Sequence, residues 1–359
     1  MTYRRTEART AYIEWAKLQA EAKYNLAASG MKGLPLSELP VKWEEMELSP
    51  GGSYGYPPLL ERLAARYGVA TKNVATAIGT SMANYLAMSA VLEPGDEVII
   101  EQPAYDPMVE VGHYLGAVVK RIPRRPEHAW QVPVDELEEM VSGKTRLIVL
   151  TNLHNPTGVL LEEDTLREIA AVAKRVGAYV LVDEVYLELL FDRPFRSAFH
   201  LGEQFIVTSS LTKAYGLSGL RCGWILAAPE LVQRMWHHND LFGNIPAHIT
   251  DRLSVIALDH LGVIRERAKK LLERNWKLLD AFLAEHPELD VVTPPGGTIV
   301  FARVPGGDGD AFAKQLLEKY ETSVVPGRFF EMPDRIRIGI CCDSEEVDEG
   351  LGRVGAALA

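Results

Sequence analysis

The sequence predicts an α/β protein, in which a large domain with a mixed, mostly parallel sheet sandwiched by helices is followed by a smaller α+β domain. From about residue 57, helical and strand patterns alternate, which is typical of a sheet covered by helices. Two strand patterns, Leu147–Thr151 and Tyr179–Val182, are unbroken apolar runs, as expected of strands buried on both faces. After Pro246 the chain changes to one long helical pattern and then to short strands and helices. We therefore expect an N-terminal segment (residues 1–45) that packs on the small domain, a large domain (46–247) and a small domain (248–359).

Local patterns define the elements of the large domain. Helices are predicted over Pro57–Tyr67, Ser81–Leu92 and Glu162–Val176, and the last one stops at Gly177, a residue type that commonly ends helices. Strands are predicted at Val74–Ile78, Glu97–Ile100, Ala117–Ile122, Leu147–Thr151, Tyr179–Val182, Phe205–Val207 and Gly223–Ala227.

The small domain begins with an unusually long helical pattern. It runs from about Ile249 to Glu285, so we expect a bend near Gly262. Strands follow at Thr298–Val304, Ser323–Val325 and Arg335–Ile340, with helices at Ala311–Lys319 and Glu345–Ala357. At the other end of the chain, Tyr3–Ala22 is expected to form a helix that packs on the small domain.

Composition excludes several classes of function. The 359 residues carry a formal net charge of −11, and no run of Lys or Arg exceeds two residues, so neither nucleic acid nor an anionic membrane is an expected partner. The three cysteines form neither a disulfide framework nor a metal-ligand spacing, so no metal is expected. Their number fits a reducing compartment, and we find no signal peptide or membrane span, which together predict a cytoplasmic protein.

The segment Ser209–Gly223 carries the most specific chemical pattern. It places Lys213 in a turn rich in Ser and Gly between two strands, and Ser210 and Arg221 can both donate to an anion. The segment resembles the lysine signature of class I/II aminotransferases, which have the fold called pyridoxal 5′-phosphate (PLP) fold type I. The resemblance implies that PLP is held as a Schiff base on Lys213, with Ser210 and Arg221 at its phosphate.

Two further segments resemble motifs of the same family. Asp183 ends an apolar strand, where open α/β sheets bind ligands, and Asp183-Glu184-Val185-Tyr186 resembles the family's Asp-x-x-Tyr step. There the Asp pairs with the pyridine nitrogen of PLP and the Tyr donates to its phenolic oxygen. Asn152–Gly158 resembles the Asn-Pro-x-Gly motif, which implies that Asn155 is a second donor to that oxygen and lies beside the substrate. His154 is interpreted as structural.

The remaining cofactor contacts are a phosphate turn and an aromatic ring. Gly79-Thr80-Ser81 opens a predicted helix, where free backbone N–H groups bind phosphate, and resembles the family's phosphate-binding turn. Tyr105 matches the position that stacks on the pyridine ring. Tyr54 resembles the tyrosine that reaches the phosphate of a neighbouring subunit, which implies a homodimer. Its spacing departs from the common one, so Tyr56 is an alternative, as is neither tyrosine.

Substrate binding is assigned to two places. Arg337, in the strand Arg335–Ile340, holds the register of the family's carboxylate-binding arginine, and a planar guanidinium suits a carboxylate. Arg335 is then a solvated or structural charge, and the alternative is that the two arginines have the opposite roles. Gly30 belongs to a segment, Tyr24–Gly30, that resembles the strand lining the substrate pocket. A second arginine in a register suited to a dicarboxylate is not found, which disfavours aspartate and glutamate.

The resemblance implies an aminotransferase that moves an amino group between an amino acid and a 2-oxo acid, with Lys213 as anchor and general base. β-Elimination, γ-replacement, cyclisation and decarboxylation need the same cofactor residues and remain alternatives, as does a PLP-bound sensor without turnover. A nicotinamide enzyme is disfavoured because Gly79-Thr80-Ser81 lacks the Gly-x-Gly-x-x-Gly pattern.

Overall fold

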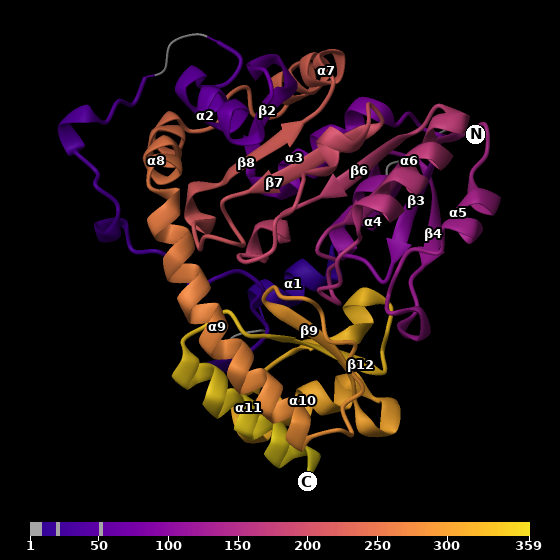
Figure 1. The fold of residues 1–359 in the computed structure, drawn as a ribbon, viewed down its shortest axis with the longest axis vertical. Coiled ribbons are helices and arrows are strands. Elements are labelled where there is room, and N and C mark those ends of the chain that lie inside the picture. Colours follow the sequence, from indigo (N-terminus) through magenta and orange to yellow (C-terminus); the bar gives the residue numbers. More distant parts are fainter. Residues whose placement is uncertain (1–8, 19–21, 50–52) are drawn as a thin grey trace.

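The computed structural model describes residues 9–18, 22–49 and 53–359, and its centre is a seven-stranded sheet (Figure 1). The strands lie in the order β2 (Val74–Ile78), β8 (Cys222–Leu226), β7 (Phe205–Ser210), β6 (Tyr179–Asp183), β5 (Thr145–Thr151), β3 (Glu97–Gln102) and β4 (Val118–Pro123). Strands β4, β3, β5, β6 and β7 are parallel, whereas β8 runs antiparallel to both of its neighbours. The prediction of a mixed, mostly parallel sheet is confirmed.

Helices cover both faces of this sheet. One face packs against α3 (Gly79–Val91), α4 (Asp106–Tyr114) and α7 (Pro229–Asp240), and the other against α2 (Pro57–Tyr67), α5 (Val134–Met140), α6 (Glu163–Val176) and α8 (His248–Asp259). Successive side chains of β5 alternate between the two cores: Leu147 and Val149 join the core that contains α3, and Ile148 and Leu150 join the core that contains α6. The apolar run of β5 is thus explained by burial on both faces.

A smaller unit follows at the C-terminal end (Figure 1). Its antiparallel sheet has the order β11 (Val325–Pro326), β12 (Arg335–Gly339) and β9 (Ile299–Arg303), while β1 (Tyr24–Asn25) pairs in parallel with β10 (Thr322–Ser323). The helices of this unit are α9 (Leu261–Glu285), α10 (Gly309–Tyr320) and α11 (Ser344–Leu358), and α9 connects it to the larger one. The predicted strand Ser323–Val325 is divided between two sheets.

The predicted long helix is interrupted close to the expected place. The break is at His260, with φ −112° and ψ 14°, and Gly262 already belongs to α9. Helix α6 ends at Gly177 as predicted, where φ is +71°. Within the described residues, no helix is both long and apolar enough to cross a membrane.

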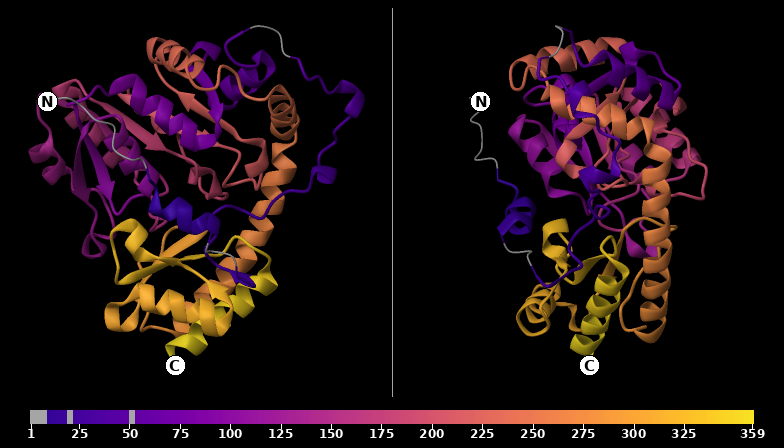
Figure 2. Two further views of the ribbon diagram at one scale, coloured as in Figure 1. Left: turned by 180° about the vertical axis from the view of Figure 1, so that it is seen from behind. Right: turned by 90° about the vertical axis from the view of Figure 1, so that its left-hand side faces the viewer.

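Helix α1 (Ala11–Leu18) lies on one side of the molecule, at the level where the two units meet (Figures 1 and 2). Its Tyr12 ring is 5.6 Å from that of Phe330 in the smaller unit and 5.8 Å from that of Tyr105 in the larger one. The Tyr12 amide also donates to the carboxylate of Asp106 at 3.2 Å. The N-terminal helix therefore contacts both units and not the small domain alone; the rest of its predicted span, residues 1–8 and 19–21, lies outside the described residues.

Candidate active site

Most of the predicted site residues surround one cavity at the carboxyl edge of the large sheet. The cavity has a volume of about 290 Å³. It is lined by Tyr12, Ile13, Ala16, Ser29, Thr80, Ser81, Asn84, Tyr105, Thr151, Asn155, Asp183, Val185, Tyr186, Thr212, Lys213 and Arg221. Eight of these were predicted from motifs. Of the other predicted residues, Gly30, Gly79, Ser210 and Arg337 adjoin the lining, whereas Tyr54 lies elsewhere on the chain.

Lys213 lies in the loop between β7 and β8, and its amine faces two hydroxyl-bearing residues. Nζ donates to Ser29 Oγ at 2.9 Å, and the same oxygen accepts a hydrogen bond from Tyr186 at 2.9 Å. Burial acts to lower the pKa of Lys213, but the phenols of Tyr186 and Tyr12 outweigh it and the pKa is raised. A Cβ at Gly30 would lie 3.2 Å from Cδ of Lys213, so this glycine makes room for the lysine.

Asp183 ends β6 and is buried next to the cavity. Its Oδ2 accepts from Asn84 Nδ2 at 2.8 Å and its Oδ1 from the Val185 amide at 3.0 Å. In the described part of the chain no Lys, Arg or His forms an ion pair with it, and burial raises its pKa to about 6. Motif reasoning missed Asn84. The available signal was a lone amide on a face of α3 that otherwise buries Ala83, Leu86 and Ala87.

The predicted phosphate turn opens helix α3. Gly79 has φ +74°, and a Cβ there would collide with the guanidinium of Arg221. The backbone carbonyl of Arg221 accepts from the Gly79 amide at 2.7 Å, which joins this turn to the lysine loop. Thr80 Oγ1 is buried without a partner among the described residues. Ser210 is buried next to the turn, and its Oγ accepts from the Thr212 amide at 3.2 Å.

Arg337, on β12, is held by three acceptors and is fully buried. Nη1 donates to Asn155 Oδ1, and Nη2 donates to the hydroxyl of Tyr12 and to the carbonyl of Ala27, each at 2.9 Å. Arg337 does not line the cavity, because Tyr12 covers it. Arg335 is buried too, with its guanidinium 5.0 Å from the Trp130 ring, so of the two interpretations the structural one holds.

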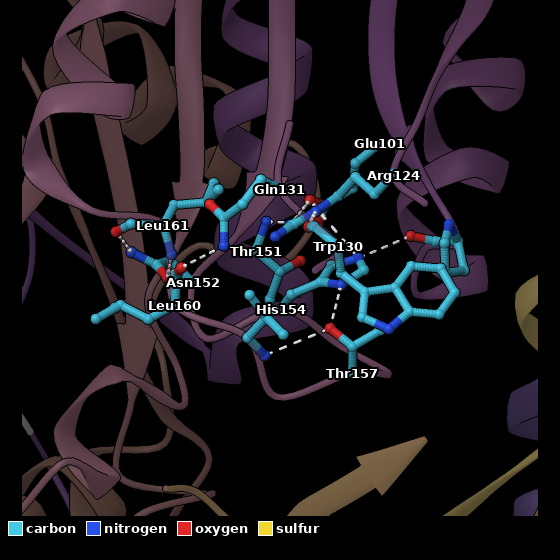
Figure 3. A network of polar contacts seen from close by, with 12 residues as sticks. Glu101, Arg124, Trp130, Gln131, Thr151, Asn152, His154, Thr157, Leu160 and Leu161 are labelled. Atoms are coloured by element: carbon cyan, nitrogen blue, oxygen red, sulfur yellow. Dashed lines mark hydrogen bonds and ion pairs between the residues drawn. The ribbon is translucent and has the colours of Figure 1, made fainter. Parts of the chain in front are cut away.

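A buried polar network supports the loop that carries Asn155 (Figure 3). Glu101 accepts from the Thr151 amide at 2.6 Å and from Arg124 Nη1 at 2.7 Å, and Arg124 Nε also donates to the carbonyl of Trp130. The ring nitrogens of His154 lie 2.9 Å from the carbonyl oxygen of Pro103 and 2.7 Å from Thr157 Oγ1. Burial and the charge of Arg124 lower the pKa of His154 well below its ordinary value, so a neutral, structural His154 fits.

The two tyrosines considered for a neighbouring subunit do not line the cavity of their own chain. Tyr54 is half-exposed, stacks on Trp236 with ring centroids 5.8 Å apart, and donates to Asp240 at 3.0 Å. The hydroxyl of Tyr56 accepts from Arg252 at 2.9 Å. Their proposed role stays a prediction.

The residues around the cavity fit the chemical groups of PLP. A phosphate matches the unpartnered hydroxyl of Thr80, with Ser81 and the exposed guanidinium of Arg221 beside it. A protonated ring nitrogen matches the buried carboxylate of Asp183, which forms no ion pair among the described residues. The amine of Lys213 opens onto the same cavity and can hold a carbonyl carbon covalently.

Comparisons with known proteins agree with this geometry. The sequence matches the family described as aminotransferase class I and II over residues 46–354. It is 28% identical to capreomycidine synthase of Streptomyces vinaceus over 94% of this chain and 90% of that protein, and 29% identical to an arginine–pyruvate transaminase of Pseudomonas aeruginosa over 85% and 81%. The fold is similar to that of a PLP-dependent aminotransferase from Streptococcus suis, with a TM-score of 0.93, 27% identity and 98% of each chain covered. The chain therefore belongs to the class I and II aminotransferases, a family of PLP-dependent transferases that act on amino acids and 2-oxo acids.

Proposed function

We propose that this protein is an aminotransferase that moves an amino group between an amino acid and a 2-oxo acid. One observation carries the proposal: Lys213, Asp183 and Asn155 line a single cavity, and Arg337 lies behind it, where it donates to Asn155 Oδ1 at 2.9 Å. The first can accept a proton, the second can hold one at a ring nitrogen, and the third can orient a carboxylate.

The roles of the side chains follow from their positions. Bound PLP supplies an electron sink for charge that develops at the substrate Cα. Asp183 would keep a proton at the ring nitrogen, while Asn155 and Tyr186 would donate to the ring oxygen. With its free amine, Lys213 would take the proton from the substrate Cα and deliver it to the carbon of PLP that carries the amino group, and Tyr105 would cover the ring against water. Arg337 fixes the carboxylate, which determines the bond that is broken.

The lining of the cavity supports an amino acid with an uncharged side chain. Among the described lining residues, the cationic ones are Lys213 and Arg221, both of which face the cofactor site. Helix α1 contributes Ile13 and Ala16, which offer no charge partner to a second carboxylate. We therefore propose a monocarboxylic amino acid in preference to aspartate or glutamate.

Cyclisation of an amino acid is the second candidate. It is favoured by the similarity to capreomycidine synthase, which extends over 351 residues of alignment. The two functions use the same cofactor residues, so they differ in their products alone.

Product analysis separates these functions. Holoprotein is incubated with ¹⁵N-labelled amino acids and a set of 2-oxo acids, and the products are identified by mass spectrometry. Transamination transfers the label to the 2-oxo acid and leaves the matching keto acid. Release of ammonia or carbon dioxide, or a ring-closed product that keeps its nitrogen, would refute the aminotransferase.

We also propose a cytoplasmic homodimer with the large domain at residues 46–247 and the small domain at 248–359. Exposed apolar side chains support an interface on the large domain: Leu241, Phe242 and Ile245 follow α7, and Tyr54 lies beside that helix. If Tyr54 reaches the phosphate of its neighbour, a mixed dimer of one Tyr54→Phe subunit and one inactive Lys213→Ala subunit has one complete site. That site keeps Lys213 and receives Tyr54 from the other subunit, so it binds PLP more tightly than the sites of the Tyr54→Phe homodimer. Sedimentation as a monomer at micromolar concentration would exclude this arrangement.

A further inference from the structure

Tyr12 lies between the cavity and the guanidinium of Arg337. Its hydroxyl accepts from Nη2 of Arg337 at 2.9 Å, and its side chain is buried and lines the cavity. Arg337 itself has no place in the lining. A ligand that enters the cavity therefore meets Tyr12 before it meets Arg337.

The donor geometry of Arg337 leaves no vacant pair of hydrogens for a carboxylate. A carboxylate binds a guanidinium through two parallel N–H···O bonds, from Nε and Nη2 or from Nη1 and Nη2. Both edges include Nη2, whose two hydrogens go to Tyr12 and to the carbonyl of Ala27. Nε is buried without a partner among the described residues, so half of one edge is ready for a ligand. Bidentate binding thus requires either Tyr12 or Ala27 to release Nη2.

Tyr12 is the more easily displaced of the two acceptors. The other is a backbone carbonyl, whereas Tyr12 is a side chain on an eight-residue helix whose other residues are half-buried or exposed, so few contacts besides those of Tyr12 hold the helix in place. Its oxygen also lies near two cations, since Arg337 donates to it at 2.9 Å and Lys213 lines the same cavity. Burial, the largest single influence, raises the pKa of Tyr12, but these two cations together lower it. An oxygen between these two cations occupies the position that suits the carboxylate of an amino acid whose nitrogen is at Lys213.

We propose that the hydroxyl of Tyr12 occupies the carboxylate site of Arg337 in the ligand-free protein and is displaced when an amino acid or 2-oxo acid binds. The inference rests on the proposed function, since it takes Arg337 as the carboxylate site. It makes Tyr12 a selectivity residue: an uncharged acceptor competes for Nη2 less well than a carboxylate, which binds through two charged oxygens. Displacement also moves α1, where Trp15 stacks on Tyr12 with ring centroids 6.5 Å apart and can report the change.

The test measures carboxylate binding in place of turnover. Holoprotein is titrated with propionate and with its uncharged counterpart propionamide, followed by tryptophan fluorescence and calorimetry. Tyr12→Phe keeps the ring and removes the competing oxygen, so its Kd for propionate falls about tenfold, the value of one charge-assisted hydrogen bond. The Kd for propionamide changes less, because its carbonyl is an uncharged acceptor that binds through one oxygen.

Tyr24→Phe is the matched control. It removes a hydroxyl that accepts from Arg353 Nη2 at 3.3 Å, the same kind of contact away from the cavity, and it leaves the Kd for propionate unchanged. Weaker binding of propionate to Tyr12→Phe would mean that Tyr12 helps to bind the carboxylate, and equal binding would mean that Tyr12 does not compete with it. Either result overturns the inference. Arg337→Met tests the underlying function separately: if propionate still binds it normally, the assignment of Arg337 fails whatever Tyr12→Phe shows.

Discussion

The buried ion pair between Glu101 and Arg124 allows a quantitative prediction for Glu101→Gln. The two side chains are 1% and 0% exposed, and Glu101 also accepts the Thr151 amide at the end of β5. Burial raises the pKa of Glu101 and lowers that of Arg124 despite their mutual attraction, so the intact pair contributes little net stability. Removing one charge leaves Arg124 buried and uncompensated, which costs about 3–5 kcal/mol.

The assay is urea unfolding of the PLP-free protein, followed by circular dichroism and fluorescence. Glu101→Gln lowers the free energy of unfolding by about 3–5 kcal/mol, whereas Glu101→Gln with Arg124→Met recovers most of the loss. Glu163→Gln breaks the exposed pair of Glu163 with Arg167 and changes stability by less than about 0.5 kcal/mol. A loss below about 1 kcal/mol for Glu101→Gln, or no recovery in the double variant, would show that the pair is not desolvated as described.

Four further predictions concern the site. Borohydride reduction of the holoprotein adds the mass of PLP to the peptide that contains Lys213, and a PLP adduct on another lysine contradicts the assignment. Lys213→Ala lowers the rate of amino-group transfer at least about 10²-fold. Because burial raises the pKa of Asp183 to about 6, PLP affinity measured by dialysis falls as pH drops below about 6, and Asp183→Asn binds PLP weakly with no such pH dependence. Arg337→Lys loses the bidentate contact and raises KM for amino acids about 10–100-fold with a smaller change in kcat; an unchanged KM excludes it from substrate binding. Burial raises the pKa of Glu184 to about 8, so the stability that its protonated form contributes is complete below about pH 4.5 and is lost as pH rises through 8. Glu184→Gln makes the free energy of unfolding less dependent on pH in this range. An unchanged pH dependence shows that another group titrates.

Elements with strong local patterns could be predicted from the sequence. The α2 helix matches its prediction at both ends, and β5 and β6 stand out because a parallel strand buried on both faces is a continuous apolar run. Helices α4 and α7 have no counterpart in the predicted set. Helix α4 has nine residues, and Gly112 interrupts its short apolar pattern. Helix α7 ends in His-His-Asn-Asp, residue types of low helix propensity that obscure its helical period.

The residues of the candidate site also fall into two groups, those that the sequence identifies and those that it does not. Lys213 and Asp183 stand in compact motifs, so their sequence neighbours identify them. Ser29, Asn84 and Tyr12 reach the cavity from separate segments as single polar residues, and no neighbouring residue marks them. Their positions become evident when the two sheets and α1 are assembled, because each acts through a partner far away in the sequence.

The pairing of β2 with β8 has a consequence for the order of folding. Because β8 runs antiparallel to β2, the end of one strand meets the start of the other, and Ile78 pairs with Cys222. That pairing closes a loop of 222 − 78 = 144 residues, and contacts of such long range form slowly because the entropy of closure must be overcome first. The turn at Gly79 and the guanidinium of Arg221 come together in this step. Uptake of PLP during refolding therefore reports the completion of the sheet edge, and it should lag behind the appearance of helical structure.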